Sequence, residues 1–580
     1  MKTVLGIHAF IHDSGACIAR DGEVFAISQE RLDRVKRSAA FPAEAVRYVL
    51  SAAGIGGINE VDVAVFDLFE RQGGETLLGL RNLGYRGRAE PLRHHDAHAA
   101  SAYFASPFDE AAVLVVDGAG SNGEEYPPGA PPHFLASHFG WMQEVQSFYR
   151  AEGNSIILVR RTFATPGYAL GIGFLYGLAS EYLGFDKLDG GKLMGLASYG
   201  RHRKKFDENL FADADGDLLV PFRRTGPVDE DFSRLGREIF AGTPPRGPEE
   251  KILQAHSDLA FFVQKQAEKT MLALARRLRA VTGSKNLCLA GGVALNGPAN
   301  MKILQEAGFD NVFIQPASND SGIPLGCALH GLHSSPGGAP RFRMKHAFLG
   351  REYSTTEIES ALRTHQAALD VSRPENTAAA LAASLAAGET AGLFHGPSEF
   401  GPRALGARSI LADPRRPDMK HILNSRVKFR EPFRPYAPAV LEERAADFFF
   451  SSGPSPFMLL IADARPGPAK KIPAAVHADG TARLQTVDRK TNPRLYSIVR
   501  EFDRLTGIPM VLNTSMNTSG EPVAESPEDA VNCLLKTGLD CLAIGDFLVR
   551  KKSSGHTAAP GRSNRSRRRP DARISFPDNI

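Results

Sequence analysis

Cysteine is rare in this sequence, and its spacing excludes two common kinds of small, stapled fold. The 580 residues include five cysteines, and no two of them form a Cys-x-x-Cys pair. A disulfide scaffold and a zinc ribbon are therefore excluded. An odd, scattered set of thiols favours a reducing compartment. The five positions are Cys17, Cys288, Cys327, Cys533 and Cys541.

Long apolar runs are also missing. A membrane span needs about 18 apolar residues, and the nearest candidate, residues 167–180, is shorter and rich in glycine. The first apolar stretch is interrupted by His8, His12 and Asp13, unlike the apolar core of a signal peptide. We therefore expect a cytoplasmic protein that has no membrane partner.

Most of the chain has little excess of either charge. The formal net charge is +4, but residues 551–580 alone contribute +6, which leaves −2 for the rest. Residues 553–580 combine arginine with serine, proline and glycine, so we expect a disordered basic tail. Because the rest of the chain is slightly acidic, nucleic acid is not the expected main ligand, and only the tail favours it.

A turn-rich segment divides the chain into two large units. Residues 333–340 read His-Ser-Ser-Pro-Gly-Gly-Ala-Pro, which predicts a linker. We therefore predict one domain over residues 1–340 and a second over residues 346–552, followed by the tail. With 43% hydrophobic residues, both units can bury substantial cores.

Short apolar segments alternate with helical patterns in the first unit, which predicts an α/β fold. Residues 3–7 and 24–27 are expected to pair as a hairpin across the turn at Asp21-Gly22. Ser257 and Gly283 are expected to begin and end a long helix. Further elements are expected at residues 42–51 (helix) and at residues 63–66, 113–116 and 287–289 (strands).

Two of these strands run into glycine-rich turns. One turn begins Asp117-Gly-Ala-Gly, and the other reads Gly291-Gly292-Val-Ala-Leu-Asn296. Together with the early hairpin, this order is typical of nucleotide-binding folds of the actin, Hsp70 and sugar-kinase type. In those folds, glycines let backbone amides approach phosphate and adenosine.

Histidines at helical spacing indicate a metal site. His94 and His98 would share one face of a helix, and His95 with His98 is an alternative pair. Asp117, at the end of a buried strand, and Asp320, in a polar turn, add two carboxylates. Two nitrogen and two oxygen ligands suit iron, manganese or zinc better than calcium.

Several cations lie in glycine- and proline-rich surroundings. In the first unit, Lys36 and Arg37 follow the hairpin and Lys192 lies in a glycine-rich loop, so all three suit an anionic nucleotide. In the second unit, residues 399–409 and 424–435 contain five arginines and a lysine. Rigid segments of this kind direct guanidinium groups at a small phosphate or carboxylate.

These residues carry a resemblance to the NodU/CmcH family, the carbamoyltransferases of nodulation-factor and antibiotic biosynthesis. The resemblance covers residues 3–552. The motifs that carry it are His12-Asp13-Ser14, the His94/His98 pair, Gly-Gly-Val-Ala-Leu-Asn at 291–296, Glu-Phe-Gly-Pro-Arg-Ala-Leu-Gly at 399–406 and Leu-Asn-Thr-Ser-Met-Asn at 512–517. It implies an actin/Hsp70-like, two-lobed domain similar to TsaD, followed by a YrdC-like α/β domain.

The resemblance also implies roles for individual residues. His94, His98, Asp117 and Asp320 would bind Fe²⁺ or another divalent transition metal. His12 would lie beside the carbamoyl group. The nucleotide would contact Lys36, Arg37, Lys192, Gly291, Gly292 and Asn296. In the second domain, carbamoyl phosphate and ATP, the latter with Mg²⁺, would be held by Arg403, Lys428, Arg434, Asn513 and Ser515.

The predicted function is ATP-dependent O-carbamoyl transfer. Carbamoyl phosphate and ATP would give carbamoyl-AMP, and its carbamoyl group would pass to a hydroxyl of a small-molecule natural product. Carbamoylation of a tRNA or another macromolecule, and a non-catalytic nucleotide-binding scaffold, are the alternatives. Contacts to the acceptor are expected from residues 67–70 and 124–165, which include Trp141. The sequence indicates neither the acceptor nor the oligomeric state.

Overall fold

The computed structural model describes residues 2–20, 22–69, 73–121, 143–164, 169–204, 209–214, 217–221, 234, 236–333, 341–450 and 453–552. Several sequence predictions lie outside these residues: Asp21 of the hairpin turn, most of the predicted linker, the tail at 553–580, and Trp141. The predicted domain boundaries therefore stay predictions.

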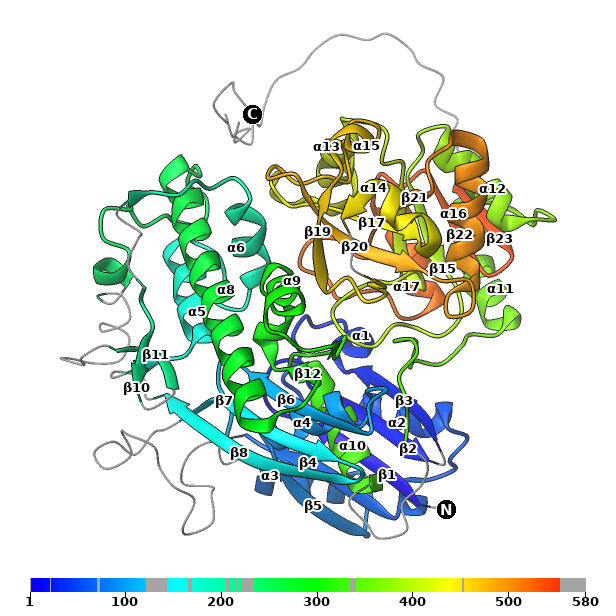
Figure 1. The fold of residues 1–580 in the computed structure, drawn as a ribbon. Coiled ribbons are helices and arrows are strands. Elements are labelled where there is room, and N and C mark those ends of the chain that lie inside the picture. Colours follow the sequence, from blue (N-terminus) through cyan, green and yellow to red (C-terminus); the bar gives the residue numbers. More distant parts are fainter. Residues whose placement is uncertain are drawn as a thin grey trace.

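A five-stranded mixed sheet forms the first lobe (Figure 1). Its strand order is β3-β2-β1-β4-β5; β1 pairs in parallel with β4 and β4 with β5, whereas β1, β2 and β3 are antiparallel neighbours. The elements are β1 (Thr3–His8), β2 (Gly15–Arg20), β3 (Glu23–Ser28), β4 (Val63–Leu68), β5 (Arg88–Arg93), α1 (Glu30–Asp33), α2 (Ala43–Ala52), α3 (Gly73–Asn82) and α4 (His94–Tyr103).

The second lobe repeats this arrangement. Its order is β13-β12-β6-β7-β8, with antiparallel neighbours β6, β7 and β8 and parallel neighbours β6, β12 and β13. The two-lobed α/β fold is therefore confirmed. The strands are β6 (Glu110–Val116), β7 (Gln143–Glu152), β8 (Ser155–Ala164), β12 (Asn286–Ala290) and β13 (Asn311–Ile314), with a small sheet of β9 (Ala169–Leu170), β10 (Ala212–Ala214) and β11 (Asp217–Pro221) beside them.

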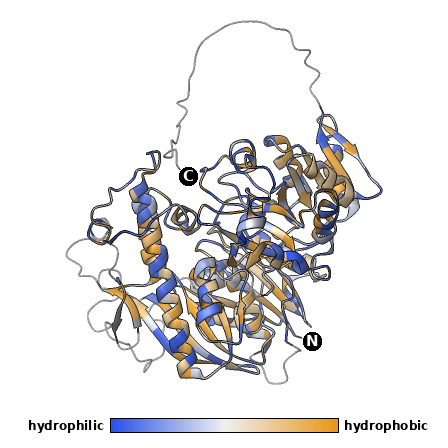
Figure 2. Ribbon diagram, turned by 45° about the horizontal axis from the view of Figure 1, so that its top comes forward, coloured by the Kyte–Doolittle hydropathy of each residue, from blue (hydrophilic) through white to orange (hydrophobic). Residues whose placement is uncertain are grey.

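Helices of the second lobe include one that is unusually long. They are α5 (Ile172–Tyr182), α6 (Gly190–Ala197), α8 (Gln254–Thr282), α9 (Gly297–Glu306) and α10 (Ile323–His333). The long helix α8 buries Leu259, Val263, Met271 and Leu278 on one face. Figure 2 shows the same helix with hydrophobic and hydrophilic residues in alternation along its length, as expected for a helix with one face on the core.

Two details of the sequence prediction are wrong. Strand β3 pairs with β2 and not with β1, because β2 occupies that edge of β1; β2 has few β-branched residues, so its strand signal is weak. Helix α8 begins at Gln254 and not at Ser257, since the ring of His256 accepts the amide N–H of Leu253 and satisfies the helix start. Its predicted end at Gly283, in the left-handed conformation, is confirmed.

Helix α10 joins the lobes. It follows β13 of the second sheet but packs on β1 and α4 of the first. The approach needs glycine, because a Cβ at Gly6 would lie 1.9 Å from the carbonyl oxygen of Pro324, and one at Gly326 would lie 1.9 Å from that of Ala97. The lobes therefore share a core.

The second unit is built on a ten-stranded mixed sheet of order β14-β23-β22-β15-β16-β21-β17-β20-β19-β18. Its strands are β14 (Leu369–Ser372), β15 (Ala391–Phe394), β16 (Arg408–Ala412), β17 (Ala437–Leu441), β18 (Phe449–Phe450), β19 (Leu460–Ala464), β20 (Thr481–Val487), β21 (Met510–Ser515), β22 (Cys541–Ile544) and β23 (Phe547–Lys551). Its helices are α11 (Thr355–Thr364), α12 (Thr377–Ala386), α13 (Met419–Ile422), α14 (Ala445–Phe448), α15 (Pro466–Ala469), α16 (Pro493–Thr506) and α17 (Pro527–Lys536).

The two units are packed against each other. Phe433 and Leu459 of the second unit are buried in the core of the second lobe, and the amide of Asn300 on α9 donates to the carbonyl of Leu459 at 3.0 Å. Among the described helices, none is both long enough and apolar enough to cross a membrane.

Candidate active site

Polar side chains gather where the parallel strands of the first lobe end. His8 ends β1, Asp67 lies at the end of β4, and His94 follows β5 as the first residue of α4. Because the carboxyl ends of parallel strands meet at one edge of a sheet, these three side chains are neighbours. Asp67 accepts hydrogen bonds from both rings, at 2.8 Å from His8 Nδ1 and 2.9 Å from His94 Nδ1.

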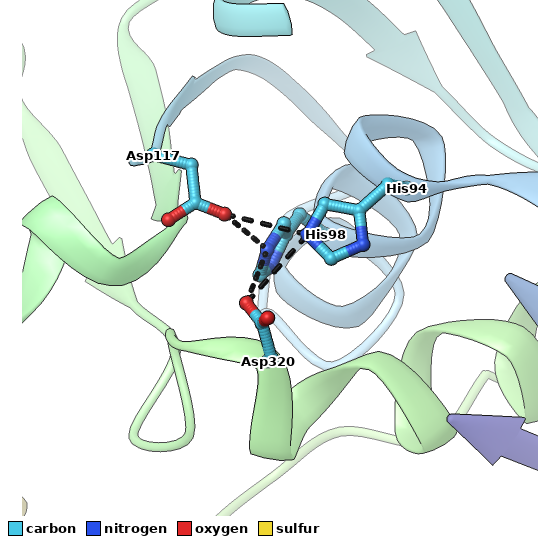
Figure 3. A group of neighbouring side chains, drawn as sticks. All are labelled: His94, His98, Asp117 and Asp320. Carbon is cyan, nitrogen blue, oxygen red and sulfur yellow. Dashed lines mark hydrogen bonds and ion pairs between the residues drawn. The ribbon is translucent and has the colours of Figure 1, made fainter. Parts of the chain in front are cut away.

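The second lobe directs two carboxylates to the same place. Asp117 follows β6, and Asp320 begins the short turn before α10. His94 Nε2 lies 3.4 Å from Asp117 Oδ2 and 3.6 Å from Asp320 Oδ1, and His98 Nε2 lies 3.1 and 3.6 Å from the same atoms (Figure 3). All four ligand atoms lie within 4.8 Å of one another and are buried, so this cluster could hold a metal ion.

The electrostatics of the cluster favour negatively charged carboxylates. Burial and the neighbouring Asp320 would raise the pKa of Asp117, but hydrogen bonds from His94 and His98 hold it well below its usual range. The pKa of Asp320 is also held well below its usual range against the cost of burial, chiefly by His12 and His94. Two buried carboxylates facing two imidazoles provide hard and borderline donors that suit a divalent transition metal.

Of the two histidine pairs predicted from the sequence, only His94 and His98 face the carboxylates. His95 turns away from the cluster, and its Nδ1 lies 2.8 Å from Ser147 Oγ. Its Nε2 is packed against Gly120, since a Cβ added at Gly120 would lie 2.9 Å from that nitrogen. The alternative pair of His95 and His98 is therefore wrong, because His95 lies on the face of α4 that meets β7.

Sequence reasoning assigned residues 67–70 to the acceptor, but Asp67 is buried behind His94. Its carboxylate holds the proton of His94 on Nδ1, which leaves Nε2 facing Asp117 and Asp320. His8 was missed altogether, although its ring reaches from Asp67 to the main-chain oxygen of His12 at 3.2 Å. The only available sequence signal was that each residue ends an apolar strand.

Replacing Asp67 with asparagine should weaken metal binding by about 10- to 100-fold, because an amide can donate to Nδ1 and move the ring proton of His94 to Nε2. Titration of the metal-free protein in competition with a chelating dye measures this change. The matched control is Asp109→Asn, since that carboxylate is 84% exposed and pairs with Arg343. Equal affinity in the two variants would contradict the orienting role of Asp67.

His12 lies at the edge of the cluster on the loop between β1 and β2. Its Nδ1 lies 3.2 Å from Asp13 Oδ2 and 3.7 Å from Asp320 Oδ2. Phe10 and Asp13 on either side adopt left-handed conformations, both with φ of 67°, a strained arrangement typical of functional loops. Burial would lower the pKa of His12, but Asp320 and Asp13 raise it to about 9. The imidazole is partly exposed and so can meet a substrate.

The cations predicted to bind nucleotide have different surroundings. Arg37 is already paired, at 2.8 Å from Asp186 and 2.5 Å from Asp189. Lys192 lies in the first turn of α6 and not in a loop, and it pairs with Asp189 at 2.9 Å and with Glu431 of the second unit at 3.0 Å. The loop assignment was wrong because a helix tolerates glycine in its first turn.

Lys36 has charges of both signs around it. Burial and then Arg37 lower its pKa, and Arg434 of the second unit contributes in the same direction, while Asp189 and Glu30 oppose the effect of these neighbouring cations on its pKa.

The glycine-rich turn after β12 supports the candidate metal ligands His94, His98, Asp117 and Asp320, which we call the metal cluster. Gly291 has φ of 88°, and a Cβ there would lie 2.2 Å from the carbonyl oxygen of Val116. The amide of Gly292 donates to Asp117 Oδ1 at 2.9 Å. Asn296 caps α9 and exchanges hydrogen bonds with Gln264. Their predicted contact with nucleotide stays a prediction, and each of the three already has a structural partner.

Arginines converge in the second unit next to the first. Burial, with Arg434 next, lowers the pKa of Arg403 to about 10. Burial lowers the pKa of Arg430 to about 10 as well. Arg483 on β20 is affected more strongly: burial, and then Arg403 and Arg434, lower its pKa well below its usual range. Sequence reasoning missed Arg483, because only the fold brings β20 to the two arginine-rich segments. We call Arg403, Arg430, Arg434 and Arg483 the arginine cluster.

Lys428 lies beside the arginine cluster at the end of a π-helical segment, Leu423–Lys428. Its ammonium donates to Ser515 Oγ at 3.2 Å and to Asn517 Oδ1 at 2.5 Å, as well as to two carbonyls of the same turn. Burial, with Arg430 next, lowers its pKa well below its usual range. Asn513 donates to Gln485, while its Oδ1 is buried without a hydrogen-bond partner among the described residues.

The loop that carries Arg403 is held by a buried acid. Glu399 Oε1 accepts three amide N–H groups, at 2.8 Å from Leu405, 2.6 Å from Ala407 and 3.1 Å from Arg408. The side chain of Arg408 is fully buried and donates to main-chain carbonyls. Arg408 therefore supports the loop and does not belong to the arginine cluster.

Comparison with known proteins gives this geometry its context. The Carbamoyltransferase N-terminus model matches residues 3–79 and 86–329, and the Carbamoyltransferase C-terminus model matches residues 382–551. This chain belongs to the carbamoyltransferase family. Both halves of the family pattern are present, so the protein is an enzyme of carbamoyl transfer, and the resemblance found in the sequence is confirmed.

Relatives of this carbamoyltransferase align over most of its length. Nodulation protein NolNO of Sinorhizobium fredii is 33% identical over 94% of this chain and 80% of its own. Nodulation protein NolO of Bradyrhizobium diazoefficiens is 36% identical over 80% of this chain and 79% of its own. Among solved structures, phosphate- and nucleotide-bound full-length HypF matches 57% of this chain and 46% of its own at 14% identity and a TM-score of 0.35, a likeness too weak to support a conclusion.

Proposed function

We propose that this carbamoyltransferase makes carbamoyl-AMP in its second unit and transfers the carbamoyl group to a hydroxyl of a small molecule in its first. Carbamoyl phosphate and water give carbamate, phosphate and a proton. Carbamate then attacks the α-phosphorus of ATP, which forms carbamoyl-AMP and releases pyrophosphate. The acceptor oxygen attacks the carbamoyl carbon, AMP leaves, and the hydroxyl proton is released.

The arginine cluster carries this proposal. Burial and the neighbouring cations, Arg434 among them, lower the pKa of Arg403, Arg430, Arg483 and Lys428, so the site is short of negative charge. Glu431 is close, but it is shared with Lys192 at 3.0 Å. A phosphate-rich ligand supplies the missing charge, and fixed cations stabilise the charge on transferring phosphoryl groups. The free Oδ1 of Asn513 suits the amide N–H of a carbamoyl group.

Transfer is assigned to the first unit. His94, His98, Asp117 and Asp320 would hold an Fe²⁺ or similar ion, which fits their two nitrogen and two oxygen donors. When bound, such an ion supplies Lewis-acid polarisation of a carbonyl or phosphate oxygen. His12, partly exposed beside Asp320, orients the acceptor hydroxyl. It can take the hydroxyl proton once a bound cation offsets the charge of Asp320, the main group that raises the pKa of His12.

The experiment that tests the first half-reaction is isotope exchange. The full-length protein with ATP, Mg²⁺, carbamoyl phosphate and labelled pyrophosphate should return label to ATP, and omission of carbamoyl phosphate should abolish the exchange. A non-catalytic scaffold would show no exchange. Absence of exchange in metal-loaded protein would also overturn the carbamoyl-AMP route.

Truncation after Lys552 separates a small-molecule acceptor from an RNA acceptor. Residues 553–580 carry six arginines and two aspartates, and we expect their removal to leave the melting temperature and pyrophosphate exchange unchanged. Salt-sensitive retention of RNA on the protein should weaken, because fewer phosphates are neutralised. Filter binding of total tRNA to both chains, beside their exchange rates, measures this. An RNA acceptor would instead require RNA-stimulated AMP release that disappears on truncation.

A further inference from the structure

Helix α1 lies at the junction of the two units (Figure 1). Its Arg31 is 3% exposed, and Nη2 donates to the carbonyl oxygen of Gly401 at 3.2 Å. Gly401 precedes Arg403 of the arginine cluster by two residues and adopts a left-handed conformation, with φ of 105°. Arg31 of the first unit therefore forms a hydrogen bond to the turn that carries Arg403.

The same guanidinium faces a buried acid. Arg31 Nη1 lies 3.8 Å from Glu525 Oε2, and Glu525 is 1% exposed. The other carboxylate oxygen accepts from the hydroxyl of Tyr48 on α2 at 2.6 Å. The main-chain oxygen of Glu525 accepts from Arg408 Nε at 3.1 Å. Glu525 thus connects helices of the first lobe with strand β16 of the second unit.

Stability alone is a poor explanation for these contacts. A buried ion pair separated by 3.8 Å returns little of the cost of removing its charges from water, and apolar side chains of similar volume often serve as well. The contacts of Arg31 instead fix the position of the Gly401 turn. A guanidinium fork has fixed geometry, so one N–H on Gly401 and another toward Glu525 define where the turn lies.

That turn connects the two clusters of the site. A Cβ at Gly401 would lie 3.0 Å from the carbonyl oxygen of Pro316 and 3.2 Å from Ala317, so the turn rests directly on the loop that leads to Asp320. Arg403 follows on the other side. Movement of the turn would therefore change the position of the arginine cluster relative to the metal cluster.

We propose that Arg31 and Glu525 are positioning residues that keep the Gly401 turn closed between the arginine cluster and the metal cluster. The proposal rests on the proposed function. With the turn closed, carbamoyl-AMP stays bound between its place of formation and its place of use. With the turn loosened, carbamoyl-AMP escapes and hydrolyses to AMP, while the groups that form it are unchanged.

The test needs no acceptor. Without one, wild-type protein mixed with ATP, Mg²⁺ and carbamoyl phosphate should release a burst of about one pyrophosphate per chain, followed by slow release of AMP. In Arg31→Met the burst should persist and the slow AMP release should rise by about tenfold, as small misplacement of a site has effects of that size or larger. A general loss of folding would lower both quantities, so a rise is diagnostic.

Further variants keep the proposal falsifiable if Arg31→Met does not fold. Glu525→Gln and Tyr48→Phe keep the volume of the side chain, and each should raise AMP release in the same direction. Arg341→Met is the control, because that arginine is 11% exposed and donates to the carbonyls of Phe108 and Tyr103, away from the Gly401 turn. Unchanged release in all three test variants, or a lost burst in Arg31→Met protein that keeps the wild-type melting temperature, would overturn the proposal. A wild-type chain that makes no pyrophosphate would instead refute the proposed function.

Discussion

His98→Ala should abolish stoichiometric metal binding and reduce carbamoyl transfer by about a thousandfold, since a Lewis acid contributes several kcal/mol to the transition state. His98 Nε2 is one of two nitrogen donors, at 3.1 Å from Asp117, and alanine offers no replacement. Elemental analysis of the purified variant measures the metal, and AMP release in the presence of acceptor measures transfer. Pyrophosphate exchange should persist, because the arginine cluster is untouched.

The neighbouring histidine provides the control for this experiment. His95→Asn changes the residue that directly follows His94 on the same helix, and His95 faces Ser147 and not the carboxylates. We expect it to retain one metal ion per chain. His98→Ala protein that still contained one ion per chain would show that these four residues do not form the site.

Arg403→Ala should reduce pyrophosphate exchange by about a hundredfold or more, comparable with the loss of a fixed group that stabilises developing charge. Lys428→Met should act in the same direction, because its ammonium orders Ser515 and Asn517. His12→Asn should keep exchange and lose transfer, since His12 lies beside Asp320 in the other unit. Comparing exchange with transfer from supplied carbamoyl-AMP separates the two half-reactions.

Arg504→Ala is the matched control for the arginine variants, because Arg504 is a 68% exposed arginine of the same unit. It should leave both half-reactions unchanged. If His12→Asn lost exchange as completely as Arg403→Ala, the two half-reactions would share one site, and the division between units would be wrong.

The sequence predicted residues whose position follows from local rules. Asp117 follows an apolar strand, and His94 and His98 are spaced by one helical turn, so strand ends and helix periodicity bring them together with Asp320. The two-lobed fold could also be predicted, because several of its strands, such as β1, β4, β6 and β12, are mainly apolar segments. The predicted pairing of β3 with β1 was wrong, however, because the neighbours of a strand depend on the whole sheet.

Residues whose partners lie far away in the chain could not be predicted. Arg483 joins the arginine cluster only because β20 lies beside β17 in the sheet. Asp67 is separated from His94 by a helix and a strand, and nothing in its sequence context distinguishes a hidden partner of a ligand from an exposed acid. The role of Arg31 could not be predicted either, because its contacts are with Gly401 and Glu525, more than 300 residues away.

The four metal-binding candidates are divided equally between the two similar lobes. His94 and His98 belong to the first lobe, and Asp117 and Asp320 follow strands of the second, so neither half of this duplicated architecture has a complete site. An ion bound by all four residues would crosslink the two lobes. At 100 times its dissociation constant it adds about 2.7 kcal/mol to the assembled state. Removal of the ion by a chelator would therefore weaken the association of the two lobes, while the packing within each lobe would stay unchanged.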